Sequence, residues 1–176
     1  MSAHMYYKYL RDEKGLTDFE KAALAVYDDI LFPYKKQLDN QIQAAIIRRE
    51  NCGVSYFIDF YQNLRVDPLP LSLKAPITVI ISKGIELRTS NSELKRRFEN
   101  DKSIVLPNSC DLSADYIDHL IDSEININLF IKYGYITEIE IYSPVGSDIP
   151  INAGIFSGKQ IVIIDEKDMS SFNYLL

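Results

Sequence analysis

The chain has 176 residues, of which 47% are hydrophobic and 25% charged. These values are typical of one globular domain and exclude a disordered or collagen-like chain. Two cysteines and two histidines are too few to build a disulfide framework or a Cys/His zinc site, so no metal or cofactor is expected. The net charge of −6 argues against binding of the whole protein to nucleic acid or to an anionic membrane.

We expect no secretory signal in the first residues. Residues 1–5 (MSAHM) lack the apolar core of a secretory signal and resemble an expression scar. The longest apolar runs are far shorter than the ~20 residues that cross a bilayer. We expect residues 6–176 to form a single domain in the cytoplasm.

A helix is predicted near the N-terminus. Residues 17–20 (TDFE) match a capping box, in which Thr17 and Glu20 each accept a backbone N–H of the first turn. Apolar residues then recur at steps of three and four: Phe19, Ala22, Ala23, Val26 and Ile30. Pro33 is expected to end this helix at Phe32, because proline disfavours helical geometry in the residue before it.

The middle of the chain alternates between strand and helix signals. Apolar residues alternate over 42–47 and again over 54–60, with a Cys-Gly turn between them, which predicts a hairpin. The β-branched run 77–81 predicts a buried strand. Residues 90–93 (SNSE) match a second capping box, which opens a short helix that reaches Phe98.

The clearest hairpin lies in the C-terminal third. Isoleucine and leucine alternate over 125–131 with Glu124, Asn126, Asn128 and Phe130. A turn is expected at 132–134, and alternation resumes over 135–142. The alternation places Glu138 and Glu140 on one face with Ile136 and Tyr142. A last strand is predicted over 160–164. The fold class is α+β: an N-terminal amphipathic helix packed on a mostly antiparallel β-sheet, with a short second helix in the middle of the chain.

Catalytic signals are weak. Paired carboxylates such as Glu138 and Glu140 can serve glycoside hydrolysis or a divalent metal, and His119 lies close to Asp118 and Asp122. However, there is no Gly-x-Ser-x-Gly elbow and no phosphate-binding glycine loop. A polar strand face and a surface histidine explain these residues more simply. A small carboxylate-dependent hydrolase or transferase around Glu138, Glu140 and His119 remains the alternative.

Charge is distributed unevenly along the chain. Residues 1–106 carry 16 basic and 14 acidic residues, whereas residues 107–176 carry 3 basic and 11 acidic ones. If the C-terminal acids share one surface, their repulsion would be relieved by a cationic partner, which they would also attract. The predicted partner-binding residues are Asp111, Asp115, Asp118, Asp122, Glu124, Glu138, Glu140 and Tyr142.

The overall plan is similar to bacterial immunity proteins that neutralise contact-dependent or polymorphic toxins, which are small, acidic α+β proteins without an active site. Locally, the chain resembles a pattern met in small bacterial domains: an aromatic–acid strand, a β-branched strand, a glycine turn, an acid-alternating strand and a proline. The matching residues are Tyr116-Ile117-Asp118, Ile125 to Ile131, Gly134, Glu138 to Tyr142 and Pro150, together with Tyr9-Leu10-Arg11 near the start.

This resemblance implies a function in binding. It implies tight one-to-one association of a monomer with a cognate toxin domain, often a nuclease, in the bacterial cytoplasm. The immunity protein would block the toxin's active site or substrate surface, with no catalytic residue of its own and without contacting nucleic acid or membrane directly. A subunit that dimerises through a tyrosine-rich sheet is a third possibility.

Overall fold

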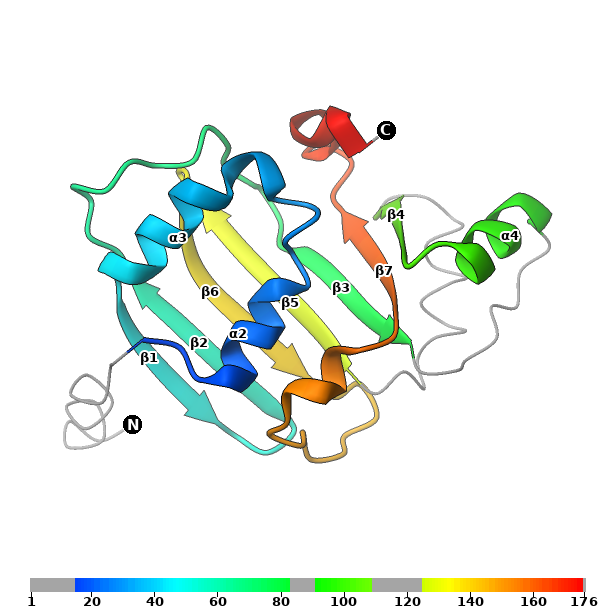
Figure 1. Ribbon diagram of the computed structural model, residues 1–176, viewed down its shortest axis with the longest axis horizontal. Coiled ribbons are helices and arrows are strands. Elements are labelled where there is room, and N and C mark those ends of the chain that lie inside the picture. Colours follow the sequence, from blue (N-terminus) through cyan, green and yellow to red (C-terminus); the bar gives the residue numbers. More distant parts are fainter. Residues whose placement is uncertain (1–14, 83–90, 109–124, 176) are drawn as a thin grey trace.

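The computed structural model describes residues 15–82, 91–108 and 125–175 (Figure 1). Seven strands form one sheet in the order β1-β2-β6-β5-β3-β7-β4, and every neighbouring pair is antiparallel except β4 with β7. The α+β class with a mostly antiparallel sheet is therefore confirmed. The strands are β1 (Ile46–Asn51), β2 (Ser55–Tyr61), β3 (Ile77–Ser82), β4 (Ser103–Pro107), β5 (Ile125–Lys132), β6 (Tyr135–Tyr142) and β7 (Lys159–Ile164).

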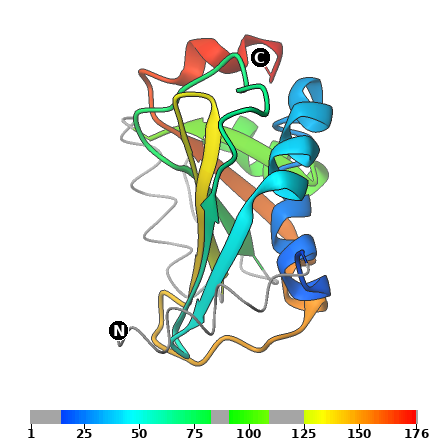
Figure 2. The same cartoon turned by 90° about the vertical axis from the view of Figure 1, so that its left-hand side faces the viewer.

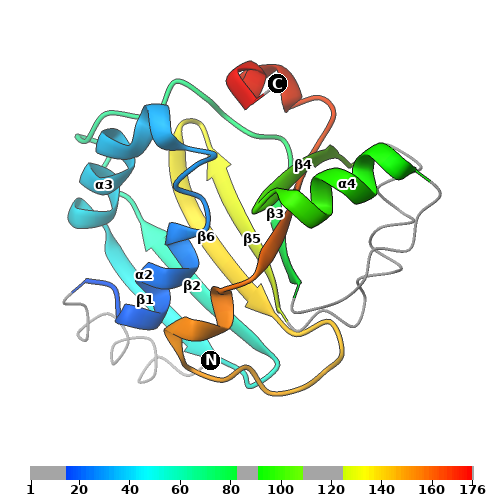
Figure 3. The ribbon, with the colours of Figure 1, turned by 45° about the vertical axis from the view of Figure 1, so that its right-hand side comes forward.

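Two helices lie together on one side of β1, β2, β6 and β5 (Figure 2). They are α2 (Asp18–Ala25) and α3 (Lys35–Ala44). A third helix, α4 (Ser92–Asn100), lies beside β4 (Figure 3). Three short 3₁₀ helices complete the described chain: η1 (Phe32–Tyr34), η2 (Ala153–Phe156) and η3 (Met169–Leu175).

The main core lies between the sheet and the α2–α3 side. Phe19, Ala23 and Leu24 of α2 pack in one cluster with the inward residues of the strands, such as Ile58 and Ile139. Burial of these apolar side chains is the main favourable contribution to folding. The cluster also contains Tyr27, whose hydroxyl donates to the carbonyl oxygens of Ile77 (2.9 Å) and Ile127 (3.0 Å).

A second, smaller core lies on the opposite face of β3 and β7. It contains Ile80, Leu94, Phe98, Ile104, Leu106, Ile161 and Ile163. Strands β3 and β7 are therefore apolar on both faces, which explains their nearly unbroken runs of isoleucine and valine. Strand β4, which the sequence pattern did not predict, pairs with β7 in parallel and supplies two residues of this cluster.

The capping box at Thr17 is confirmed. The Thr17 hydroxyl accepts from Glu20 N (3.2 Å), and Glu20 Oε1 accepts from Thr17 N (2.8 Å). Glu20 is fully buried and also accepts from Arg49 Nε (2.9 Å) and the Tyr56 hydroxyl (3.0 Å). Burial favours the protonated acid, but these hydrogen bonds and the Arg49 charge outweigh it and hold the pKa of Glu20 below its ordinary value.

The first helix is shorter than predicted, and a second one follows it. α2 ends at Ala25 rather than Phe32, and residues 42–44, predicted as strand, are the last turn of α3. Tyr34, Leu38 and Ile42 recur at four-residue steps and pack on the main core. The alternation at 42–47 therefore joins the end of one helix to the start of β1, a boundary that alternation alone does not reveal.

A β-bulge in β6 makes its residues face the core in a different pattern from the one predicted. Phe130 pairs with Glu138, but Ile131 pairs with Ile136, so Thr137 is the extra residue. The extra residue returns Ile136 to the core face, where it is fully buried beside Ile139 and Ile141. The prediction that Ile136 shares a face with Glu138 was therefore wrong.

The second helix is capped one residue later than predicted. The predicted box has Ser90 as its N-cap, but Asn91 is the N-cap of α4 and accepts from Leu94 N (3.2 Å); Ser90 itself lies outside the described residues. The helix ends at Asn100, two residues beyond the prediction.

Candidate functional site: the open face of the sheet

The face of β1, β2, β6 and β5 opposite α2 and α3 carries most of the polar strand residues. We call it the open face, because no helix among the described residues packs on it. Alternation with the buried residues places these side chains on it: Arg48, Glu50, Phe57, Asp59, Asn128, Phe130, Glu138, Glu140 and Tyr142.

Strand pairing brings carboxylates from different strands side by side. Asp59 of β2 pairs directly with Glu138 of β6, and Glu138 pairs on its other side with Phe130 of β5. Glu140 lies two residues further along β6, between Phe57 and Asn128. Paired residues on neighbouring antiparallel strands have Cβ atoms about 5 Å apart, so Asp59 and Glu138 are close enough to repel each other.

Two of these carboxylates have shifted pKa values. Partial burial, followed by the nearby charges of Asp59 and Glu140, raises the pKa of Glu138, and Lys132 only partly offsets the effect. Burial also raises the pKa of Asp59; Arg48 acts against this and Glu50 adds to it. The ionised forms of Asp59 and Glu138 are therefore less stable on this face than in water.

The basic residues of this face do not balance its acids. Arg48 pairs with Asp59 across β1 and β2 and forms a long ion pair with Glu50 (3.9 Å). Lys132 lies at the end of β5. Among the described residues, four carboxylates (Glu50, Asp59, Glu138 and Glu140) thus face two cations, which gives this part of the open face a net negative charge.

The structure brings together only part of the predicted partner surface. Glu138, Glu140 and Tyr142 share the open face, where the Tyr142 hydroxyl accepts from Asn126 Nδ2 (3.1 Å). Five further predicted residues lie outside the described residues: Asp111, Asp115, Asp118, Asp122 and Glu124. His119 and Cys110 also lie outside them.

Sequence reasoning missed the contribution of the N-terminal half. Asp59 and Glu50 lie in the region that has no excess of acids, yet β2 pairs with β6 and places Asp59 beside Glu138. The alternation of Tyr56, Ile58 and Phe60 already indicated that Asp59 faces away from the core. The pairing of β2 with β6 was the missing information.

Not every acid of the C-terminal part belongs to this face. Asp168 is buried, and its carboxylate accepts from the backbone N–H groups of Lys74 (3.0 Å) and Ala75 (3.2 Å). Asp148 lies against the β1–β2 turn, where a Cβ on Gly53 would meet its Oδ1 at 3.0 Å. Asp168 thus fixes the loop before β3.

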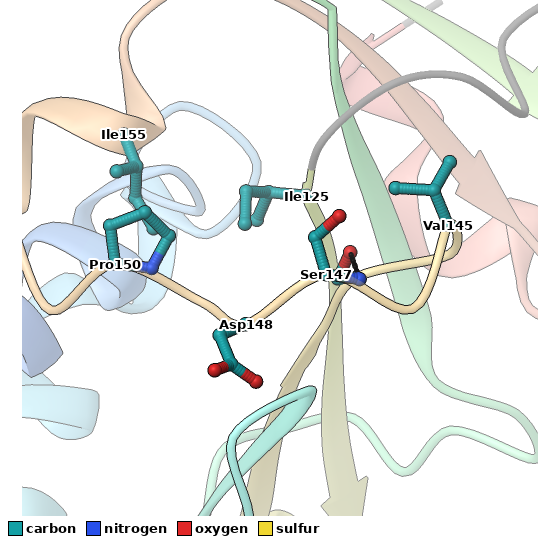
Figure 4. Close-up of a pocket in the computed structure, with 7 residues that line it drawn as sticks. Ile125, Val145, Ser147, Asp148, Pro150 and Ile155 are labelled. Carbon is teal, nitrogen blue, oxygen red and sulfur yellow. Dashed lines mark hydrogen bonds between the residues drawn. The ribbon is translucent and has the colours of Figure 1, made fainter.

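A small cavity of about 250 Å³ lies at the start of β5, beside the loop that follows β6. Its lining combines apolar side chains with two serines and one acid: Ile125, Ser143, Val145, Ser147, Asp148, Pro150 and Ile155. Figure 4 shows the Asp148 carboxylate directed away from Ile125 and Ile155. Ser147 N donates to Ser143 Oγ (3.2 Å), a contact that closes the loop.

A second depression, of about 370 Å³, lies between α2 and α3 and is lined by residues such as Leu16, Leu24 and Ile42. Neither cavity includes Glu138 or Glu140. A catalytic carboxylate pair would need a concave site that joins the two acids. These cavities do not provide one.

Within residues 15–82, 91–108 and 125–175, no three His, Cys, Asp or Glu side chains are placed so that they could hold a metal ion. Over the same ranges, the helices are too short and too polar to cross a bilayer. No known protein family matches the chain, and neither curated proteins nor solved structures show a significant similarity to it.

Proposed function

We propose that this chain is a non-enzymatic immunity-type protein that binds a basic, nuclease-type toxin domain one-to-one in the cytoplasm through the open face. The observation that carries the proposal is the pairing of Asp59 with Glu138 on neighbouring strands, where burial and nearby acids raise the pKa of both carboxylates. The fold gains nothing from this arrangement.

A cationic partner would stabilise the ionised forms of these acids. Lys or Arg side chains of the partner would replace lost hydration and cancel the repulsion among Asp59, Glu138 and Glu140. Half-buried aromatic side chains on the same face, Phe57 and Tyr142 among them, add the apolar area that stable interfaces need. The open face thus combines steering charge with rigid contact area.

The hydrolase alternative has less support. Its acids lie on a sheet face, outside both cavities described above. Its one favourable observation is the raised pKa of Glu138, which would suit a general acid. The binding proposal explains that shift without a substrate pocket.

The direct experiment uses the C-terminal toxin domain encoded by the neighbouring open reading frame, purified as an inactive variant. Binding is followed by surface plasmon resonance at low and high salt. Because exposed charges are screened over about 8 Å at physiological ionic strength, we expect the association rate to fall steeply as salt rises. Replacing Glu138 and Glu140 together with lysine should slow association about 10- to 100-fold.

A matched variant shows whether the effect depends on the open face or only on the net charge of the protein. Asp29→Lys with Asp39→Lys alters the net charge equally, but these exposed residues follow α2 and lie on α3, on the opposite side of the sheet from the open face. This control should slow association less than about 3-fold. Equal rates for the two double variants would contradict the open face as the binding surface, and absence of binding by the wild-type chain would contradict the immunity function.

A further inference from the structure

The turn between β5 and β6 holds an aromatic residue in a backbone conformation that aromatic residues avoid. Lys132 pairs with Tyr135, so the loop has two residues, Tyr133 (φ +53°) and Gly134 (φ +84°). Two successive positive φ angles are typical of a type I′ turn, whose first position favours Asn, Asp or Gly. Among the described residues, Tyr133 is the one non-glycine with positive φ.

The fold does not use the Tyr133 ring. Its exposed fraction is 87%, above that of every other exposed large hydrophobic residue described, of which Leu64 comes next at 74%. A residue in such a conformation persists where the surrounding structure fixes its backbone. The exposed ring of Tyr133 adds nothing to that fixing, so its presence in this turn points to a role outside the isolated chain.

The backbone of this turn is held firmly. Tyr133 N donates to Ser72 Oγ (2.7 Å), and Gly134 O accepts from Leu69 N (2.7 Å) and from the buried Gln41 Nε2 (2.8 Å). A Cβ on Gly134 would lie 2.4 Å from Leu69 O, so the loop before β3 packs directly on the turn. The ring is therefore exposed on a rigid support, which lowers the entropy lost when a partner immobilises it.

The turn is continuous with the open face. Glu138 pairs with Phe130, only two residues before the end of β5, so about 7–10 Å of strand separates it from the turn. An interface of ordinary size buries about 800 Å² on each partner and extends well beyond that distance. A protein seated on Glu138 and Glu140 would therefore reach Tyr133.

From these observations we infer that Tyr133 is an anchor residue that inserts into an apolar pocket of the same basic partner domain. This inference rests on the proposed function and assigns association and dissociation of the partner to different residues. The carboxylates of the open face set the association rate. The Tyr133 ring sets the dissociation rate, because buried aromatic anchors mainly affect dissociation.

The test compares three variants. Tyr133→Asn removes the ring and suits the turn, Tyr133→Phe keeps the ring, and Ile151→Asn removes an exposed apolar side chain (53% exposed) from the loop after β6, at the far end of the sheet (Figure 1). Without partner, Tyr133→Asn should raise the melting temperature by about 2–4 °C, since it relieves the turn. Binding to the neighbouring toxin domain is then measured for each variant.

We expect Tyr133→Asn to raise the dissociation rate about 30-fold or more, with the association rate changed less than about 2-fold. Tyr133→Phe and Ile151→Asn should dissociate like the wild type. Wild-type dissociation by Tyr133→Asn overturns the anchor while the proposed function stands, since the lysine variants still slow association. Loss of binding by the wild type overturns both.

One further outcome would identify a different occupant. If the chain alone self-associates in sedimentation equilibrium and Tyr133→Asn abolishes this, the ring binds a second copy of the chain. That result would overturn the anchor inference as stated.

Discussion

The pKa of a carboxylate is shifted in opposite directions on the two faces of the sheet. On the face covered by α2 and α3, Glu20 is fully buried, accepts hydrogen bonds from Thr17, Arg49 and Tyr56, and has a lowered pKa. On the open face, Glu138 is only half-buried, lies beside another acid, and has a raised pKa. Burial acts in the same direction on both acids, so the neighbours decide the outcome.

This difference separates a structural acid from a candidate binding acid. The interactions of Glu20 join α2 to β1 and β2, so the acid contributes to folding. The negative charges of Asp59 and Glu140 repel the ionised Glu138 carboxylate, so this form of Glu138 does not stabilise the fold. An acid that weakens its own fold is a reasonable candidate for a partner contact, because the partner can supply the missing cation.

The largest expected effect follows from removing the charge of Glu20. Glu20→Gln should lower the free energy of unfolding at neutral pH by about 3 kcal/mol, because Arg49 then lacks its buried counter-charge. Urea denaturation measures the change. The folded pKa of Glu20 is depressed, so its contribution is present above the unfolded pKa and is lost as pH falls through the folded one. The wild-type advantage over Glu20→Gln should shrink over that acidic range, and a constant difference would contradict this assignment.

A smaller effect is expected at the other end of the same network. Thr17→Ala removes the side-chain oxygen that caps α2 and should lower the free energy of unfolding by about 1 kcal/mol. Thermal unfolding checks the value, and binding of the neighbouring toxin domain should not change. Thr17→Ser, which keeps the oxygen, is the control. An unchanged melting temperature for Thr17→Ala would show that the cap does not stabilise the helix.

The smallest effect has the opposite sign. Glu138→Gln should raise the free energy of unfolding at neutral pH by about 0.5 kcal/mol, a value reduced by solvent screening. Because the folded pKa is raised, the favourable contribution of Glu138 is complete below the unfolded pKa and is lost as pH rises through the folded one. The gain from Glu138→Gln should therefore disappear at acidic pH.

Glu99→Gln on α4, an exposed carboxylate outside both networks, should change stability less than Glu138→Gln does. If Glu138→Gln instead lowered stability at neutral pH, the ionised carboxylate would be a structural acid like Glu20, and the comparison between the two faces would fail.

The sequence by itself determined the elements whose signals are local. The capping box of α2, the β5–β6 hairpin with its turn at Gly134, and strands β2, β3 and β7 all follow from side-chain period and cap chemistry. The boundary between α3 and β1 and the bulge at Thr137 were not predicted. Both depend on which face a residue must bury, and only contacts distant in the chain decide that.

The candidate site divides in the same way. Glu138, Glu140 and Tyr142 could be placed on one face from alternation within a single strand. Asp59 could not be assigned to them, because sequence alone does not say that β2 pairs with β6 rather than with another strand. Nor could the strain at Tyr133 be foreseen, since its positive φ results from the two-residue turn and from the loop that packs on Gly134. Local sequence sets the period of each strand, whereas the burial of the whole sheet selects its neighbours.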